Sequence, residues 1–282
     1  MALFCGFMML SACTKIGLGV ANAPTMFFDG QISRDIVYDK QTALSLDVYT
    51  PPAKADSKPS PVVVFLYGGR WSGGDKKDYA FVGTNLAKRG FVTIIPNMRH
   101  YPDVRFPAFV EDAANAVVWA HENSADYGGN KDVIFISGHS SGAHVGSLLV
   151  ADERYIGARS EGAMAAIEGF AGLAGPYDFT PQATDVKDIF STADSLDQIK
   201  AGTFIDGREP PMLLLHGRDD TTVGAFNLER FEAAIKAQDG NVQSIIYDDV
   251  NHVDIVGAIA WVLRGKAPVL EDMTAFFTKN TP

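Results

Sequence analysis

One serine in the chain has surroundings that favour nucleophilic chemistry. Ser140 is the centre of Gly138–Gly142 (GHSSG), which follows the apolar run 133–136 and leads into residues 143–150, which have helical spacing. A serine on a tight turn between a strand and a helix is held with its hydroxyl raised above the sheet edge, as in a nucleophile elbow. Glycine is expected at both ends of the pentapeptide because a Cβ there would collide where strand and helix cross.

An elbow serine reacts only when a histidine accepts its proton and a carboxylate orients that histidine. In this arrangement both partners come later in the chain, at the carboxyl ends of later strands. The apolar run 211–215 is followed by Asp219 and Asp220, and the predicted strand 242–247 is followed by His252. We therefore predict His252 as the general base. The other histidines precede the serine, lie in the elbow or on the next helix, or sit at a strand end.

Two neighbouring aspartates could supply the carboxylate. We predict Asp220, because the spacing from Asp220 to Val223 fits a turn that aims the carboxylate inward and then buries the valine. Asp219 would then face solvent as an ordinary loop charge, and it stays the alternative for the acid. His216, at the end of the preceding strand, is expected to brace the loop that carries the acid.

Such a serine also needs donors for the oxyanion that forms on the substrate. The amide of Ser141, next after the serine, would supply one donor. The second should come from the loop after the predicted strand 61–67, where Gly68 lets the backbone approach the substrate. We predict the amides of Gly69 and Arg70 as these donors, each worth ~3 kcal/mol of transition-state stabilisation. Gly68 and Trp71 are predicted to line the substrate site.

The elements that must position these residues read as an α/β fold. Residues 36–39 and 44–49 alternate as an antiparallel hairpin, and apolar strands then alternate with helical segments through the middle of the chain. This alternation predicts right-handed βαβ units and a mostly parallel twisted sheet flanked by helices. Residues 176–209 lack a strong period and are predicted to form a short cap-like insertion over the sheet edge.

Composition limits the class of protein. The chain has 282 residues, of which 46% are hydrophobic and 21% charged, as in an ordinary packed domain. We predict one domain over residues 25–282. The formal net charge of -10 argues against nucleic acid as a partner. No motif implies a metal or a cofactor, and the oligomeric state is left open.

The first 24 residues are read as an export segment and set apart from the fold. Residues 2–10 are apolar but too few to span a bilayer as a helix. They end in Leu10-Ser11-Ala12-Cys13, which resembles the lipobox of bacterial lipoproteins, although no Lys or Arg precedes it. We predict lipidation of Cys13 and a membrane-anchored lipoprotein facing the periplasm. Cleavage after Ala23 is disfavoured by Pro24, and a cytoplasmic protein is the alternative.

The motifs together resemble the α/β-hydrolase superfamily. More narrowly, the chain is similar to the small esterase group that includes carboxylesterases, feruloyl-esterase-like proteins and kynurenine formamidases. The resemblance runs from about Ile36 to the C-terminus. It rests on Tyr67-Gly68-Gly69-Arg70-Trp71, Gly74-Asp75-Lys76, Asn97-Met98-Arg99, Phe106-Pro107-Ala108, the elbow with Ala143-His144, the run from His216-Gly217 to Asp220 and Val223, and His252.

The resemblance implies roles and also shows departures. It implies Ser140 as nucleophile, Asp220 as acid, His252 as base, and the amides of Gly69, Arg70 and Ser141 as oxyanion donors. The family usually has His where Tyr67 stands and Ala or Gly where Ser141 stands. Arg70 replaces a small or aromatic residue, and its guanidinium would favour an anionic group on the substrate.

These observations predict a serine hydrolase that cleaves carboxylic esters of small to medium size through an acyl-enzyme. One alternative keeps the same three residues but cleaves an aryl formamide, as kynurenine formamidases do; export would count against it, because that pathway is cytoplasmic. The alternative from another class is a catalytically silent binding protein with the same fold.

Overall fold

The computed structural model describes residues 17, 19–53 and 58–282. The strands are β1 (Gln31–Asp39), β2 (Leu44–Thr50), β3 (Ser60–Leu66), β4 (Val92–Pro96), β5 (Gly129–His139), β6 (Ile167–Leu173), β7 (Met212–Gly217) and β8 (Val242–Tyr247). The α-helices are α2 (Ala80–Lys88), α3 (Ala108–Asn123), α4 (Ser141–Ala151), α5 (Glu153–Ile156), α6 (Glu161–Ala165), α7 (Thr184–Ile189), α8 (Phe226–Ala237), α9 (His252–Gly257) and α10 (Val269–Lys279). Short 3-10 turns are η1 (Ala23–Phe27), η2 (Lys76–Tyr79), η3 (Ser124–Tyr127), η4 (Leu196–Ile199) and η5 (Ala201–Thr203).

In the described chain, the strands form one sheet in the order β1-β2-β4-β3-β5-β6-β7-β8. β2 pairs antiparallel with both β1 and β4, and every other neighbouring pair is parallel. The predicted mostly parallel sheet and its antiparallel opening hairpin are therefore confirmed. Because parallel strands end at the same edge of a sheet, the loops after β3, β5, β7 and β8 meet there.

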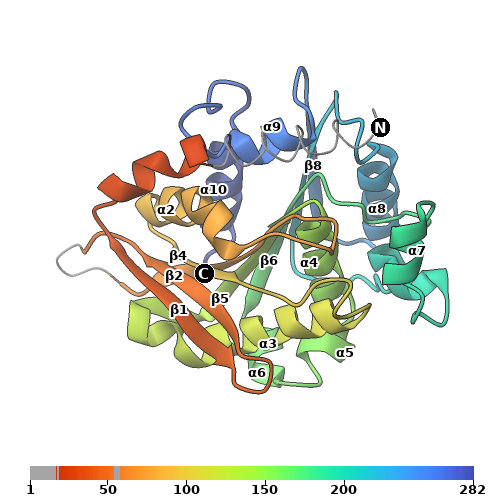
Figure 1. Ribbon diagram of the computed structural model, residues 1–282, viewed down its shortest axis with the longest axis horizontal. Helices are drawn as coiled ribbons and strands as arrows, with labels where there is room; N and C mark the ends of the chain where they lie inside the picture. The colour runs from red at the N-terminus through yellow and green to blue at the C-terminus, as the bar shows by residue number, and fades with distance from the viewer. Residues whose placement is uncertain (1–16, 18, 54–57) are drawn as a thin grey trace, which may run out of the picture.

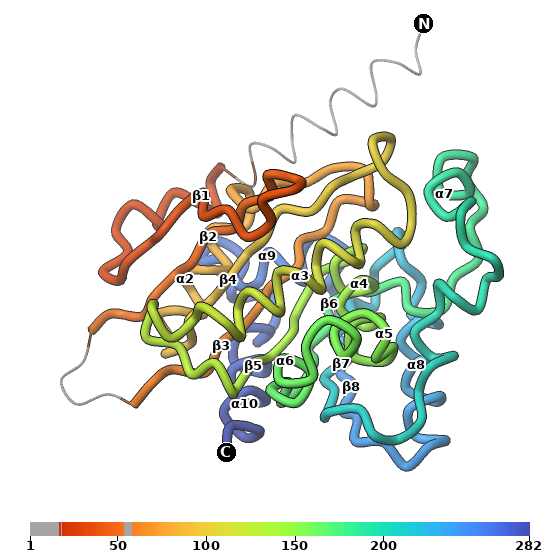
Figure 2. The backbone as a smooth tube through the Cα atoms, turned by 90° about the horizontal axis from the view of Figure 1, so that it is seen from below, coloured from red at the N-terminus to blue at the C-terminus, as the bar shows by residue number. Residues whose placement is uncertain are grey.

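Helices cover both faces of this sheet. α2 and α10 pack on one face and α3 and α4 on the other, and Figure 1 shows the first pair above the strands and α3 below them. In the view from below, α3 lies in front of the strands (Figure 2). Residues 62–66 of β3 are fully buried, which explains why this strand reads as an uninterrupted apolar run.

The segment predicted as a cap-like insertion lies between β6 and β7. It contains α7, η4 and η5, joined by irregular chain. Both views place α7 at the margin of the molecule, away from the central strands (Figures 1 and 2). Phe190, directly after α7, is buried, so this segment packs inward although its helix stands at the edge.

The folded body begins before residue 25. The side chain of Asn22 donates to the carbonyls of Lys77 and Asp78, at 3.3 and 2.9 Å, and accepts from the N–H of Phe81 at 2.8 Å. Ala21 is buried. The end of the predicted export segment, residues 1–24, thus packs against the start of α2. The predicted lipidation site, Cys13, lies outside the described residues.

A buried ion pair fixes the Gly74-Asp75-Lys76 motif to the sheet. Lys76 and Asp47 on β2 are each 1% exposed, and Lys76 Nζ lies 2.5 Å from Asp47 Oδ1 and 2.6 Å from Asp35 Oδ1. Removing one partner of such a pair leaves a buried charge uncompensated, which is strongly unfavourable. The motif therefore anchors the chain that follows β3, and it holds no place in the site itself.

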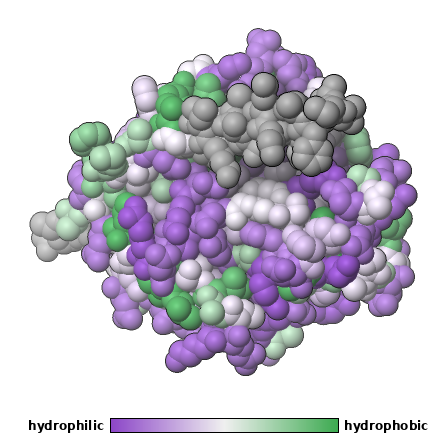
Figure 3. All heavy atoms as spheres, viewed as in Figure 1, coloured by the Kyte–Doolittle hydropathy of each residue, from purple (hydrophilic) through white to green (hydrophobic). Residues whose placement is uncertain are grey.

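The surface facing the viewer in Figure 3 is mostly hydrophilic, with small apolar areas between the polar side chains. No helix among the described residues is long and apolar enough to cross a membrane.

Candidate active site

Ser140 stands between β5 and α4 in the strained conformation of a nucleophile elbow. Its φ of 54° and ψ of -124° lie in a region that side chains rarely adopt. A Cβ on Gly138 would come within 2.6 Å of the Gly142 backbone, and one on Gly142 within 2.1 Å of the Leu66 carbonyl oxygen. The prediction that both positions need glycine is confirmed. The crossing of β3, β5 and α4 leaves no room for a side chain.

Ser140, His252 and Asp220 form one hydrogen-bonded row at the carboxyl edge of the sheet. His252 Nε2 lies 2.8 Å from Ser140 Oγ, and His252 Nδ1 lies 2.7 Å from Asp220 Oδ2. Since the carboxylate can only accept, Nδ1 carries the proton and Nε2 is free to accept the proton of the serine hydroxyl. His252 is the first residue of α9, where the Asn251 side chain caps the helix.

The loop after β7 aims Asp220 inward. Asp220 Oδ1 accepts the N–H groups of Thr222 and Val223, both at 2.8 Å. Burial raises the pKa of Asp220, but the hydrogen bonds from His252 and from these two amides outweigh burial and hold the pKa below its usual value. Val223 is buried and Asp219 is exposed, as predicted. His216 Nε2 lies 3.0 Å from the Val223 carbonyl oxygen and so braces this loop, also as predicted.

His139, immediately before the serine, holds the backbone of His252. Its Nε2 lies 2.9 Å from the His252 carbonyl oxygen and donates to it, and the two rings lie 4.9 Å apart. Burial, and then the nearby His252, lower the pKa of His139 to about 3, so its ring stays neutral. The sequence places His139 in the elbow but gives no signal for this contact, which joins residues 113 positions apart.

The loop after β3 lies against the elbow, although one predicted donor is already engaged. The N–H of Gly69 donates to Ser141 Oγ at 3.0 Å. A Cβ on Gly68 would lie 3.0 Å from the Ser140 Cβ, so this glycine permits the close approach. Arg70 and Trp71 both have positive φ, 55° and 57°, and turn the chain around the site. Ser141 stands where the family usually has Ala or Gly, and its hydroxyl makes this contact with Gly69 possible.

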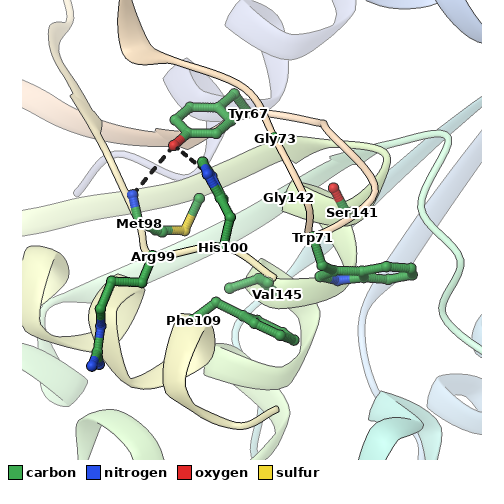
Figure 4. A pocket seen from close by; sticks show the side chains of 10 residues that line it. All are labelled: Tyr67, Trp71, Gly73, Met98, Arg99, His100, Phe109, Ser141, Gly142 and Val145. Carbon is green, nitrogen blue, oxygen red and sulfur yellow. Dashed lines mark hydrogen bonds between the residues drawn. The ribbon is translucent and has the colours of Figure 1, made fainter. Parts of the chain in front are cut away.

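Tyr67 anchors this loop from behind. Its hydroxyl accepts the N–H of Met98 at 3.2 Å and lies 3.1 Å from His100 Nε2 (Figure 4). The Tyr67 ring also stacks on Tyr79, with ring centres 5.8 Å apart. Tyr67, Met98, His100 and Ser141 border a cavity of about 20 Å³, which is room for about one water molecule. Tyrosine in place of the family's usual histidine thus ties the loop after β3 to the loop after β4.

A cleft of about 350 Å³ opens directly over Ser140. Trp71 lines it, as predicted, whereas Gly68, predicted with it, does not. The indole stacks on Phe179 with ring centres 5.3 Å apart. Trp71 Nε1 also donates to His144 Nδ1 at 3.2 Å, which fixes the indole. Several lining residues, Phe179 among them, come from the predicted insertion, so that segment shapes the cleft.

Arg70 is paired with a carboxylate of the predicted insertion. Its guanidinium, expected to favour an anionic substrate group, donates through Nε and Nη2 to both carboxylate oxygens of Asp185 on α7, at 3.0 and 2.9 Å. The two residues are 115 positions apart, so no local pattern reveals the pair.

Among the described residues, no group of three or more His, Cys, Asp or Glu side chains is placed to hold a metal ion.

The sheet order and the elbow define the class: this is an α/β-hydrolase fold. Esterase B from Lactobacillus rhamnosis, solved in an inhibited form, matches with a TM-score of 0.80 and 18% identity, over 99% of this chain and 96% of that one. A truncated carbohydrate esterase from gut microbiota matches with a TM-score of 0.76 and 20% identity, over 90% and 97% of the two chains. At these identities the likeness shows the fold alone.

The BD-FAE family profile matches residues 46–234, and the chain belongs to this family. A probable isoprenylcysteine alpha-carbonyl methylesterase of Oryza sativa subsp. japonica is 27% identical over 249 residues, covering 81% of this chain and 60% of the relative. Esterase LipQ of Mycobacterium tuberculosis is 26% identical over 238 residues, covering 78% and 56%. The chain thus spans between about half and two thirds of the length of these curated relatives.

Proposed function

We propose that this protein is a serine esterase that cleaves carboxylic esters of small to medium size through an acyl-enzyme. The observation that carries the proposal is the row in which His252 lies 2.8 Å from the Ser140 hydroxyl and 2.7 Å from the Asp220 carboxylate. These distances allow direct proton transfer from the serine to the histidine. The esterase names of the relatives in the same family support ester hydrolysis.

In the proposed reaction Ser140 Oγ attacks the carbonyl carbon of the ester while its proton passes to His252 Nε2. The tetrahedral intermediate collapses, the bond to the alcohol oxygen breaks, and the departing alcohol takes the proton from His252. Water then attacks the acyl carbon while His252 Nε2 accepts one of its protons. The bond between the acyl carbon and Ser140 Oγ breaks, the serine oxygen takes the proton back from His252, and the carboxylic acid is released. Asp220 keeps the histidine in the correct tautomer and stabilises the imidazolium that forms twice in each cycle.

The amides of Gly69, Arg70 and Ser141 are the proposed donors to the oxyanion. The Ser141 amide is the first N–H of α4, which has no partner within the helix. The Gly69 amide, which donates to Ser141 Oγ in the free protein, has to turn to the oxyanion or share its proton with it. The cleft of about 350 Å³ lies at the lower end of the usual range for ligand sites, which favours small to medium acyl groups.

A panel of p-nitrophenyl esters of increasing chain length tests the proposal, together with N-formylkynurenine and a fluorophosphonate probe. We expect hydrolysis of the shorter esters, little turnover of the formamide, and covalent labelling of the wild-type protein. If N-formylkynurenine were turned over faster than the esters, the protein would be assigned as a formamidase that uses the same three residues. An absence of both turnover and labelling would favour a silent binding protein.

Replacing His139 by phenylalanine should slow the reaction without weakening substrate binding. The ring is kept, but the hydrogen bond that holds the His252 carbonyl is lost, and one such bond is worth ~1 kcal/mol, or roughly a fivefold to tenfold fall in kcat. We expect KM to stay within about twofold and His139→Gln, which keeps a donor, to recover most of the rate. A purely structural role would instead lower the melting temperature of both variants and leave kcat per folded molecule unchanged.

We also propose that the protein is an exported lipoprotein held at the membrane, facing the periplasm, through a lipidated Cys13. Cleavage before Cys13 would leave in place Asn22, which bonds to the start of α2, whereas cleavage after Ala23 would remove it. Mass spectrometry of the mature N-terminus separates these outcomes. An unprocessed chain beginning at Met1 would favour the cytoplasmic alternative.

A further inference from the structure

Arg70 is the only charged side chain among the described residues that line the cleft over Ser140. It follows Gly69 directly, so its backbone belongs to the proposed oxyanion loop, while its half-exposed side chain extends to Asp185 on α7. The other lining residues are aromatic, aliphatic or neutral polar, including Trp71, Phe179 and Asn227. Whether the charge of this one side chain is paired or free therefore decides whether the cleft suits an uncharged or an anionic acyl group.

The guanidinium is held by a carboxylate outside the cleft. Nε and Nη2 of Arg70 each donate to one oxygen of Asp185, the two-bond geometry that matches a guanidinium best. The hydrogen bond from Arg70 lowers the pKa of Asp185, so this carboxylate stays ionised at neutral pH. A substrate carboxylate has either to displace Asp185 or to use the N–H groups of Nη1 and Nη2 that Asp185 does not engage, and in both cases it meets the negative charge of Asp185.

We propose that Asp185 is a specificity-determining residue that neutralises Arg70, so that the cleft takes uncharged acyl groups and excludes acyl groups that end in a carboxylate. This inference rests on the proposed esterase function. It reverses the role expected for Arg70 from the sequence alone. The same pair joins the oxyanion loop to α7, so the segment that shapes the cleft and the loop that binds the oxyanion share one contact.

The same helix offers a matched control. Asp188 on α7 accepts two hydrogen bonds from Arg105, at 3.1 and 2.8 Å, and one from the Tyr101 hydroxyl at 2.8 Å. Arg105 does not line the cleft. Asp188→Asn therefore removes the same unit of charge and breaks an equivalent ion pair on α7, but it releases no cation beside Ser140.

The experiment compares two p-nitrophenyl esters of equal reach, the hydrogen adipate and the 6-methylheptanoate, whose branched end has the shape of a carboxylate without its charge. The readout is the ratio of kcat/KM for the anionic ester to kcat/KM for the uncharged ester, at low salt. Wild-type protein should favour the uncharged ester. Asp185→Asn should raise the ratio by roughly tenfold, because one guanidinium is released to a carboxylate. Asp188→Asn should leave the ratio within about twofold.

Two further measurements identify the cause. The double variant Arg70→Gln/Asp185→Asn should lose the gain, and high salt should reduce it in the single variant, since exposed charges are screened. An unchanged ratio in Asp185→Asn, or an equal rise in Asp188→Asn, would overturn the inference while hydrolysis of the uncharged ester persists. If wild-type protein cleaves neither ester, the proposed function itself has failed.

Discussion

Replacing Ser140 by alanine is expected to lower kcat for p-nitrophenyl esters by roughly 10⁶-fold, to the level of a protein that only binds the ester. The substitution removes the only oxygen that lies within hydrogen-bond reach of His252 Nε2 in the described chain. Without it no acyl-enzyme can form, and the imidazole has no proton to accept from the protein. The loss should appear in kcat, with KM little changed, and labelling by a fluorophosphonate should disappear.

Ser147→Ala is the matched control for this variant. Ser147 lies on α4, the helix that begins directly after Ser140, and is buried, but its hydroxyl donates to the carbonyl of His144 at 2.7 Å and does not line the cleft. It should keep wild-type turnover and labelling. If Ser140→Ala retained more than about a hundredth of wild-type kcat, another group would have to act as the nucleophile, and the acyl-enzyme mechanism would be wrong.

The sequence could predict the three hydrogen-bonded residues at the sheet edge because each of them follows a buried strand. Apolar runs mark β5, β7 and β8, and the residue types after them specify where Ser140, Asp220 and His252 lie along the chain. Parallel strands then bring these positions to one edge without any knowledge of side-chain contacts. The spacing from Asp220 to Val223 even separated the two aspartates, since it describes a turn that is local in the sequence.

Contacts between distant segments could not be predicted in this way. The Arg70–Asp185 pair depends on where α7 packs, and α7 belongs to the stretch whose sequence has no clear period. To predict the contact of Ser141 Oγ with the Gly69 amide, the relative position of two loops would have to be known to within the length of a hydrogen bond. Periodicity specifies which face of an element is buried, but it carries no information at that precision.

Local irregularity explains why the first strand was predicted too short. β1 runs over Gln31–Asp39, whereas alternation is visible only from residue 36. Its pairing with β2 shifts between Ser33 and Ile36, and Asp35 has a φ of 56°. An extra residue in a strand moves all later side chains to the other face, so the pattern before the bulge is out of phase with the pattern after it.

Replacing Asp220 by asparagine should lower kcat by about 10⁴-fold while the fold stays intact. An amide of nearly the same shape can donate to His252 Nδ1, which favours the tautomer that carries its proton on Nε2. That tautomer cannot accept the proton of Ser140. The variant also removes the negative charge that stabilises the imidazolium.

Asp219→Asn distinguishes this explanation from a general effect of charge on the loop. Asp219 is the adjacent residue, it is exposed, and its N–H donates to the Val250 carbonyl at 3.0 Å, a contact that the side-chain change leaves in place. We expect this variant to keep kcat within about threefold, as for a surface substitution. A large loss in Asp219→Asn with a small loss in Asp220→Asn would transfer the acid to residue 219. Comparable losses in both variants would mean that the loop contributes through its overall charge. A specific hydrogen bond to His252 would instead make one carboxylate necessary for the reaction and leave its neighbour dispensable.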